Sequence, residues 1–209
     1  MPGYRTRDMQ VERELALFMD NHLYNDGRFL THRRTDDLTS QLSGSDIVLT
    51  LPTLNLRDII VDEKGQSQYL TRPLPTFSLE LSFMSQDQVI IGWFIDDNKV
   101  TEYYMFIWPE AKVNWNAKEE DFTRVEYMLV PKNALRSFFE AEGYDKNALI
   151  SKAKSIRDEG IVGPIDKRND KDYWFYYTSG DKLPEQPINI IVRKNIYRNL
   201  SIMSGVIQA

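Results

Sequence analysis

Two apolar runs, residues 46–51 (DIVLTL) and 56–62 (LRDIIVD), constrain the fold of this chain more than any other feature. The stretch between them, residues 52–55, is Pro-Thr-Leu-Asn, and both proline and asparagine favour turns. Runs rich in Ile, Val and Leu on either side of a turn predict an antiparallel β-hairpin. If this hairpin turns in the middle of that stretch, paired residue numbers sum to about 108, so Asp46 faces Asp62.

The alternation of side chains along a strand adds a third charged group to this pair. Every second residue points to the same face, so Lys64 shares a face with Asp62 and Asp46, whereas Glu63 points the other way. Two carboxylates directly across a hairpin, with Cβ atoms about 5 Å apart, are destabilising unless a cation compensates them. We interpret Asp46 and Asp62 as ligands of a divalent metal ion and Lys64 as a catalytic group beside the attacking water, an arrangement suited to phosphodiester hydrolysis.

The composition limits which metal such a site can hold. The 209 residues include no cysteine and only two histidines, which excludes disulfides and thiolate zinc sites and nearly excludes a histidine-rich site. Carboxylate oxygens remain as ligands, and oxygen ligands suit magnesium, manganese or calcium. For hydrolysis of a phosphodiester we expect Mg²⁺ or Mn²⁺.

The spacing of these residues also resembles a known signature. Gly44-x-Asp46-Ile47, followed by a hairpin and by Asp62-x-Lys64 at the end of an apolar strand, is similar to the motif of the PD-(D/E)XK nuclease superfamily. The resemblance covers residues 9–66. It implies a restriction-endonuclease-like core, in which one helix precedes three strands, and a metal-dependent endonuclease that acts on DNA.

The resemblance implies one further acidic residue, on the helix before the hairpin. The stretch VEREL, residues 11–15, is similar to the glutamate-bearing helix start of archaeal Holliday-junction resolvases. By this likeness Glu12 is a catalytic and metal-ligating acid, and Glu14 is the fallback. The alternative from the residues alone is a solvent-facing helix charge that pairs with a neighbouring arginine.

Residues between the helix and the hairpin are candidates for contacts with DNA. Arg33 and Arg34 form a local basic patch that could bind phosphates, and Gln41 could contact a phosphate or a water at the scissile group. Arginine pairs beside acidic loops also form salt bridges, here with residues such as Asp36 and Asp37.

The net charge of −5 shows no basic excess of the kind that general nucleic-acid binding usually needs. This charge favours an alternative function, a non-catalytic protein-interaction module such as a degenerate nuclease-fold protein. Aromatic runs such as EYYMFIW and DYWFYY could stack nucleobases, but they are equally typical of a sheet core or of a homodimer contact.

Other acidic residues have ordinary explanations. The triplets Asp97-Asn98-Lys99 and Glu110-Ala111-Lys112 repeat the acid-x-lysine spacing, but a whole strand separates them, so their acids cannot share a metal. Glu80 lies in the apolar strand FSLELSF, where alternation places it on a face with Ser78 and Ser82. A role for Glu80 in the acidic cluster stays open.

The order of the remaining elements predicts an α+β fold with a mixed or antiparallel sheet flanked by helices. We expect a helix at 9–24, a strand in 28–34, an antiparallel meander of 77–83, 88–95 and 100–109, a strand at 122–131, helices at 132–142 and 146–159, strands at 172–179 and 187–194, and a short helix after 195. We interpret residues 1–209 as a single domain with a nuclease-like core at about 9–110 and a C-terminal elaboration at about 111–209.

The N-terminal stretch MPGYRTRDMQVERE is charged where a signal peptide would need an apolar core. No run approaches the roughly 20 apolar residues of a membrane span. The sequence therefore predicts a cytoplasmic protein without a membrane partner.

Overall fold

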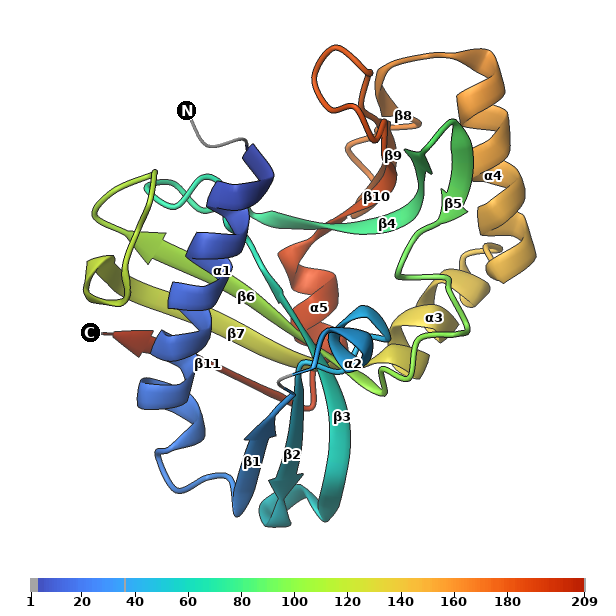
Figure 1. Cartoon of the computed structure of the whole chain (residues 1–209). Coiled ribbons are helices and arrows are strands. Elements are labelled where there is room, and N and C mark those ends of the chain that lie inside the picture. The colour runs from blue at the N-terminus through green and yellow to red at the C-terminus, as the bar shows by residue number, and fades with distance from the viewer. Residues whose placement is uncertain (1–3, 36, 209) are drawn as a thin grey trace. The chain divides into compact units, whose positions relative to one another are not determined.

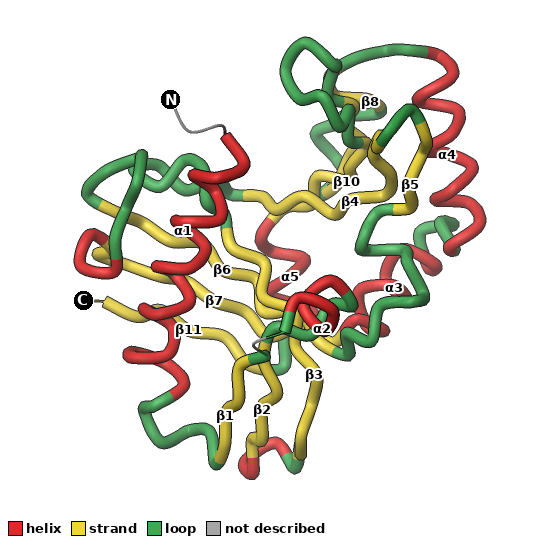
Figure 2. Tube along the Cα trace, viewed as in Figure 1, coloured by secondary structure: helices red, strands yellow, loops and turns green. Residues whose placement is uncertain are grey.

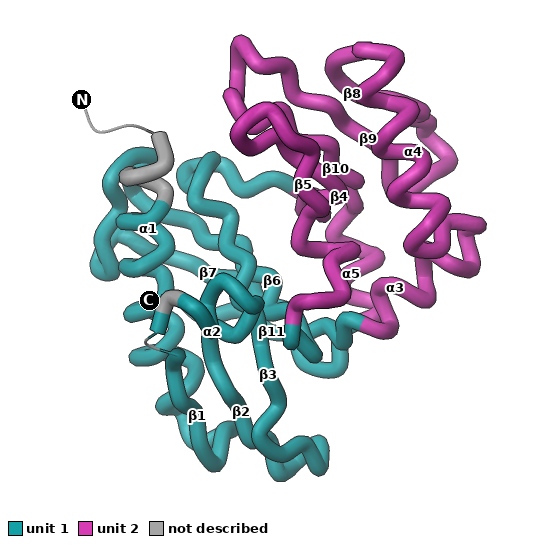
Figure 3. The backbone as a smooth tube through the Cα atoms, turned by 45° about the vertical axis from the view of Figure 1, so that its right-hand side comes forward, with its two compact units in different colours: residues 1–74, 100–132, 201–209 teal, residues 75–99, 133–200 magenta. Residues whose placement is uncertain are grey.

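The computed structural model describes residues 4–35 and 37–208, and it divides the chain into two compact units. Unit 1 takes residues 1–74, 100–132 and 201–209, and unit 2 takes residues 75–99 and 133–200 (Figure 3). The units interleave along the sequence and do not divide near residue 110, because strands from the C-terminal half complete the sheet of unit 1.

Unit 1 is built on a mixed sheet of six strands (Figures 1 and 2). Its elements are helix α1 (Tyr4–Met19), a π-helical turn (Asp20–Tyr24), β1 (Thr31–Arg34), α2 (Leu38–Leu42), β2 (Ile47–Leu51), a 3-10 turn (Pro52–Leu54), β3 (Leu56–Gly65), β6 (Tyr103–Ala111), a 3-10 turn (Glu119–Asp121), β7 (Phe122–Pro131) and β11 (Met203–Gln208). The strand order is β1-β2-β3-β6-β7-β11, and only the β3–β6 pair is parallel.

The predicted hairpin is present with the predicted register. Ile47 pairs with Val61 and Val48 with Ile60, so the paired numbers sum to 108 along the part of the hairpin that carries the two aspartates. The turn is a 3-10 turn that ends at Asn55, which adopts a left-handed conformation with φ of 54°. Asparagine tolerates this conformation better than most residues, which explains its place in the turn.

Helix α1 covers one face of this sheet with its apolar side. Val11, Leu15 and Phe18 lie at helical spacing and are buried in a core that includes Ile47, Val61 and other odd-numbered strand residues. At the end of β3 the helix approaches the backbone closely, because a Cβ atom on Gly65 would stand 2.6 Å from Cδ2 of Leu15. The absence of a side chain at residue 65 therefore allows α1 to pack here.

One part of the predicted sheet is wrong. Residues 77–83 and 88–91 do form an antiparallel pair, but residues 103–109 leave this pair and run parallel to β3 in the other sheet. Strand β6 is buried along most of its length, which suits a central strand of a mixed sheet with apolar residues on both faces. Both faces of β6 are covered, as its aromatic pattern predicted.

Unit 2 carries a five-stranded antiparallel sheet with the order β5-β4-β10-β9-β8. Its elements are β4 (Thr76–Ser85), β5 (Gln88–Ile91), α3 (Lys132–Ala141, from the boundary with unit 1), α4 (Lys146–Glu159), β8 (Gly163–Ile165), β9 (Tyr173–Tyr177), β10 (Ile188–Arg193) and α5 (Lys194–Leu200). Helix α4 has the predicted ends, since Asp145 accepts a hydrogen bond from the amide of Ala148 and Gly160 adopts φ of 68°. The predicted α+β class with a mixed sheet flanked by helices is confirmed.

Within the described ranges, no helix combines the length and the apolar character that crossing a membrane requires.

Candidate functional site

Asp46 and Asp62 lie side by side across the β2–β3 hairpin. The amide of Asp46 donates to the carbonyl of Val61 (3.0 Å), and the carboxylate of Asp46 accepts a hydrogen bond from the amide of Glu63 (2.8 Å). Asp62 is 3% exposed. Residues 62–65 belong to a strand and not to a solvated turn, because β3 continues through Gly65.

Lys64 closes the group from the same face of the strand. Its Nζ donates to Oδ1 of Asp62 at 2.6 Å, and its side chain is 24% exposed. Burial by itself would lower the pKa of Lys64, but the negative charges of Asp62 and Asp46 outweigh it and raise that pKa. We call Asp46, Asp62 and Lys64 the aspartate–lysine cluster.

The two carboxylates repel each other, and this repulsion changes the pKa of Asp46. Burial and the neighbouring charge of Asp62 raise the pKa of Asp46 to about 7, although Lys64 pulls it down. At neutral pH this part of the protein therefore holds more negative charge than one ammonium group neutralises. An acid whose pKa is raised by burial and by a neighbouring acid, as that of Asp46 is, is more frequent at functional sites than elsewhere.

The donor set fits a divalent cation held by two side chains. In residues 4–35 and 37–208, no group of three or more histidine or acidic side chains is arranged to hold a metal ion. Mg²⁺ commonly takes only one or two carboxylates from the protein and completes its shell with water and substrate phosphate. Asp46 and Asp62 provide such a pair, with oxygen atoms that Mg²⁺ and Mn²⁺ prefer.

Glu12, predicted as a metal ligand, lies near the cluster but does not complete a three-acid group with it. Its carboxylate adds a minor effect to the raised pKa of Lys64, so it lies within electrostatic reach. Helix α1 packs on the face of the sheet that carries the odd-numbered residues, whereas Asp62 and Lys64 point to the other face. Glu14, the fallback, accepts a hydrogen bond from the amide of Glu119 (3.2 Å) and serves a different contact.

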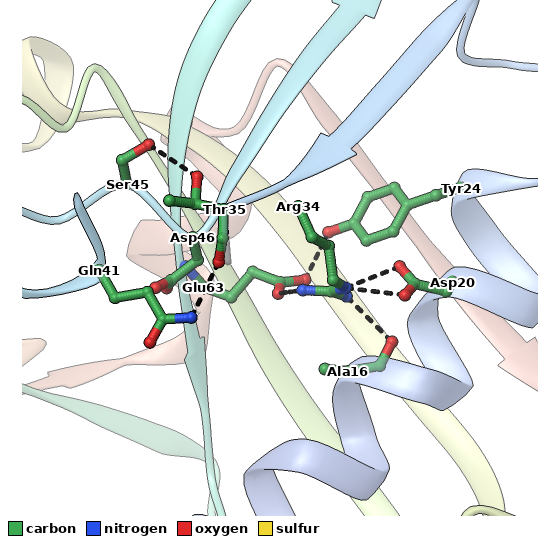
Figure 4. Close-up of polar contacts among 9 residues, drawn as sticks. All are labelled: Ala16, Asp20, Tyr24, Arg34, Thr35, Gln41, Ser45, Asp46 and Glu63. Atoms are coloured by element: carbon green, nitrogen blue, oxygen red, sulfur yellow. Dashed lines mark hydrogen bonds and ion pairs between the residues drawn. The ribbon is translucent and has the colours of Figure 1, made fainter. Parts of the chain in front are cut away.

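A second charged group lies on the opposite face of β3 and was not predicted. Arg34 contacts both carboxylate oxygens of Asp20 (2.7 and 2.9 Å) and donates to the carbonyl of Ala16 (2.9 Å) and to Glu63. The hydroxyl of Tyr24 donates to the other oxygen of Glu63 at 2.7 Å (Figure 4). We call Asp20, Tyr24, Arg34 and Glu63 the arginine cluster; it ties α1 and the π-helical turn to β1 and β3.

The residues predicted to contact DNA differ in how many contacts their side chains make within the protein. The guanidinium of Arg34 is occupied by the arginine cluster, and its partners are Asp20 and Glu63. Asp36, one expected partner, lies outside the described residues, and Asp37 instead caps α2 by accepting from the amide of Ser40. Arg33 is exposed on β1.

Gln41 holds the loop before Asp46 in place. Its amide nitrogen donates to the carbonyl of Thr35 at 2.9 Å (Figure 4). The amide of Thr35 in turn donates to the carbonyl of Asp46. Gly44 in this loop has φ of 85°, a conformation that favours glycine, and its carbonyl accepts from the hydroxyl of Thr101. The loop is therefore anchored on both sides of residue 44.

The other acid-x-lysine triplets belong to ordinary ion pairs. Asp97 pairs with Arg136 and with Lys146, and Glu110 pairs with Arg124 at 3.0 Å. Glu80 lies in unit 2 on β4, opposite Asn189 of β10, and is partly buried between the apolar residues of an alternating strand.

Sequence reasoning missed the arginine cluster although one observation pointed to it. The alternation that places Asp62 and Lys64 on one face requires Glu63 to enter the apolar face beneath α1, where a carboxylate needs partners. Asp20, Tyr24 and Arg34 supply them, but their distance in sequence hides the contact.

Comparison with protein-family models, with curated proteins and with solved structures found no match to this chain.

Proposed function

We propose that this protein is a metal-dependent phosphodiester hydrolase, an endonuclease of the PD-(D/E)XK type that acts on DNA with Mg²⁺ or Mn²⁺. One observation carries the proposal: two adjacent carboxylates, Asp46 and Asp62, share one face of a hairpin with the ammonium of Lys64, which contacts Asp62 at 2.6 Å. The helix followed by three antiparallel strands, α1 with β1, β2 and β3, supports the same superfamily.

Each residue has a defined role in this proposal. Asp46 and Asp62 would hold the cation, which when bound polarises the phosphate and lowers the pKa of a water molecule. Lys64 places a positive charge beside the carboxylates, where it would orient the nucleophile and stabilise the charge that develops on the phosphate oxygens. The backbone amide of Glu63 fixes the orientation of Asp46 throughout.

Two variants separate metal binding from catalysis. Asp62→Asn removes one ligand, so we expect metal binding by calorimetry to weaken at least about tenfold and cleavage to stop. Lys64→Ala leaves both carboxylates, so we expect metal binding to remain and cleavage of plasmid, single-stranded or branched DNA in Mn²⁺ to fall at least about 100-fold. An unchanged cleavage rate in Lys64→Ala would remove this residue from the mechanism.

The chain offers a matched control in its other Asp-x-Lys triplet. Asp97→Asn and Lys99→Ala make the same chemical changes at a triplet in unit 2, where Asp97 is paired with Arg136 and Lys146. We expect both to keep metal binding and cleavage. Loss of cleavage in either control would show that the assay responds to general damage.

A second function is favoured by an exposed apolar strand in unit 2. β5 lies at the edge of its sheet, and Val89, Ile90 and Ile91 are 57%, 37% and 45% exposed. Such an edge can pair with a strand of another protein or of a second copy, as a non-catalytic interaction module would. Absence of cleavage for every DNA substrate, together with no thermal shift in Mg²⁺ or Mn²⁺, would favour this function over the hydrolase.

A further inference from the structure

Strand β5 forms one edge of the sheet in unit 2, and it lacks features that usually keep an edge strand from pairing (Figure 1). Its four residues, Gln88–Ile91, include no charged side chain and no proline. Val89, Ile90 and Ile91 are all exposed, and because side chains alternate they lie on both faces of the strand. Proteins commonly protect edge strands with charged side chains or prolines. The edge at β5 is therefore suited to pairing with a further strand.

The other sheet edges differ from β5. Strand β1 carries Arg33 and Arg34, and β8 has only three residues, one of which is Pro164. In β11, two of the three exposed side chains are the polar Ser204 and Gln208. In β5, by contrast, three of the four exposed side chains are apolar. Pairing at β5 would therefore bury more apolar surface for its length than pairing at these edges.

The hairpin with β4 determines which backbone groups of β5 face outward. The amide of Gly92, directly after β5, donates to the carbonyl of Leu81 at 2.8 Å. In an antiparallel pair, every second residue exchanges its backbone hydrogen bonds with the neighbouring strand. Ile90 is therefore bonded to β4 as well. The N–H and C=O groups of Val89 and Ile91 point to the open edge.

These outward groups are matched by a second, antiparallel copy of the same strand. When Ile90 lies opposite Ile90 of the second copy, each Val89 lies opposite Ile91 of the other strand. Both residues of such a pair exchange N–H···O bonds, so all the outward groups of the two residues are satisfied. A shift of the register in either direction leaves some of these groups without a partner on the other β5. The symmetric register is therefore the best one.

Side chains and charges also agree with this register. Residues directly opposite share a face of the sheet, so valine meets isoleucine and isoleucine meets isoleucine. The acidic residue next to the strand is Asp87. In the antiparallel arrangement its two copies lie at opposite ends of the paired strands, about 20 Å apart, where they do not repel each other strongly. No like charges therefore meet at the centre of the contact.

Helix α4 leaves room for the second copy. It packs on the sheet of unit 2 over β4 and β10, not at the outer edge of β5. In the paired sheet, β4 and its copy are separated by three strand spacings, about 14 Å. A helix with its side chains is about 10–12 Å wide, so the two copies of α4 can lie on the same face without overlap.

We propose that this protein forms a symmetric dimer in which the β5 strands of two copies pair and join their five-stranded sheets into one. A contact that uses the same surface on both copies closes after two copies and removes both open edges. The interface is smaller than the roughly 1,200 Å² of a standard interface, so the dimer is weak and depends on protein concentration. The dimer does not depend on whether the protein cleaves DNA.

The first test changes the residue at the centre of the contact. Sedimentation velocity of the full chain at up to about 500 μM detects association with a Kd of up to about 1 mM. The parent protein should shift from monomer toward dimer over this range. Ile90→Lys places two ammonium groups opposite each other and removes two apolar side chains, so it should weaken association at least about tenfold. Lysine is well tolerated on an edge strand, so the variant should fold.

The second test restores the contact with opposite charges. Ile90→Glu alone should weaken association as much as Ile90→Lys does, because two carboxylates then face each other. An equimolar mixture of the two variants should associate at least about tenfold more tightly than either variant alone, since lysine now lies opposite glutamate. This rescue requires residue 90 of one copy to lie opposite residue 90 of the other.

Val206→Lys is the matched control. It introduces the same charge at an apolar side chain that is 48% exposed, on the edge strand β11 of unit 1. We expect the Kd of the dimer to stay within about twofold of that of the parent, the ordinary scatter for exposed positions.

Three results would overturn the proposal. The first is a parent protein that stays monomeric over the whole concentration range. The second is a dimer that dissociates in Val206→Lys and persists in Ile90→Lys, which would place the contact at β11. The third is a mixture of Ile90→Lys and Ile90→Glu that associates no better than the separate variants.

Discussion

The two faces of β3 hold charged clusters of opposite character within consecutive residues. On one face, Asp46 and Asp62 share a single ammonium, and their repulsion raises the pKa of Asp46 to about 7. On the other face, both oxygens of Glu63 have donors, and Arg34 also holds both oxygens of Asp20. The arginine cluster is satisfied by the protein alone, whereas the aspartate–lysine cluster would gain from a further cation.

This difference separates a structural tie from a candidate site. Burial opposes the charged form of Arg34, but the carboxylates of Glu63 and Asp20 outweigh this and raise its pKa, so it stays charged at every accessible pH. A cluster of that kind stabilises one conformation. A cluster with excess negative charge can take up a proton or a cation when the pH or the cation concentration changes. Sites for binding and catalysis need this property.

The largest expected effect on stability comes from breaking the arginine cluster. Arg34→Met leaves Asp20 and Glu63 partly buried without a counter-charge, so the free energy of unfolding should fall by about 3 kcal/mol in urea denaturation. Arg33→Met, on the exposed side of the same strand, should change it by less than about 0.5 kcal/mol. Equal effects of the two changes would contradict the assignment of Arg34 as a tie.

The next effect would come from a divalent cation bound at the aspartate–lysine cluster. Mg²⁺ or Mn²⁺ at about 100 times its Kd should stabilise the protein by about 2.7 kcal/mol, measured as a rise in Tm. The rise should disappear in Asp62→Asn and persist in Glu63→Gln, which removes a charge from the opposite face of the same strand. A rise that depends on Glu63 instead would place the cation in the wrong cluster.

A smaller effect should appear with pH in protein kept free of metal by chelator. The pKa of Asp46 is higher in the folded than in the unfolded protein, so the folded state binds more protons between about pH 4 and pH 7. Its contribution to stability is present below about pH 4 and is lost as pH rises through about 7. In Asp46→Asn this part of the fall in Tm should be absent, and an identical pH profile in both proteins would refute the repulsion between the two acids.

The smallest effect tests how closely α1 packs on β3. Gly65→Ala places a Cβ atom 2.6 Å from Cδ2 of Leu15, and because that atom ends a side chain it can move partly away. We expect a loss of about 1 kcal/mol in urea denaturation. Gly180→Ala is the control, since its nearest neighbour is the flexible end of Gln186 at 3.2 Å, and its loss should be smaller.

Local patterns predicted the hairpin register and most elements, because turn residues and strand alternation act over short distances. The ends of α4 followed from Asp145 and Gly160 for the same reason. The placement of β6 beside β3 and of β11 beside β7 could not be predicted. These pairings join segments that are distant in sequence, and no local sequence pattern specifies which strand becomes the neighbour of another.

In the candidate site, too, the local arrangement could be predicted and the long-range contacts could not. Asp46, Asp62 and Lys64 come together because the register of one hairpin and the alternation of side chains along a strand define their positions. The position of Glu12 could not be predicted in this way, because the helix that carries it packs on the other face of the sheet, and a single sequence does not reveal which face a helix covers.

The late position of two strands also bears on how the protein is made. Strand β3 ends at residue 65, but its parallel neighbour starts only at residue 103, and the edge strand β11 ends at residue 208. Ribosomes extend a chain by about 5–20 residues per second, so the nascent sheet waits for seconds with open edges before each partner emerges. We therefore expect chaperones to contact the chain during synthesis. The β2–β3 hairpin with Asp46, Asp62 and Lys64 can form early, but the sheet around it is complete only after β11 has been synthesised.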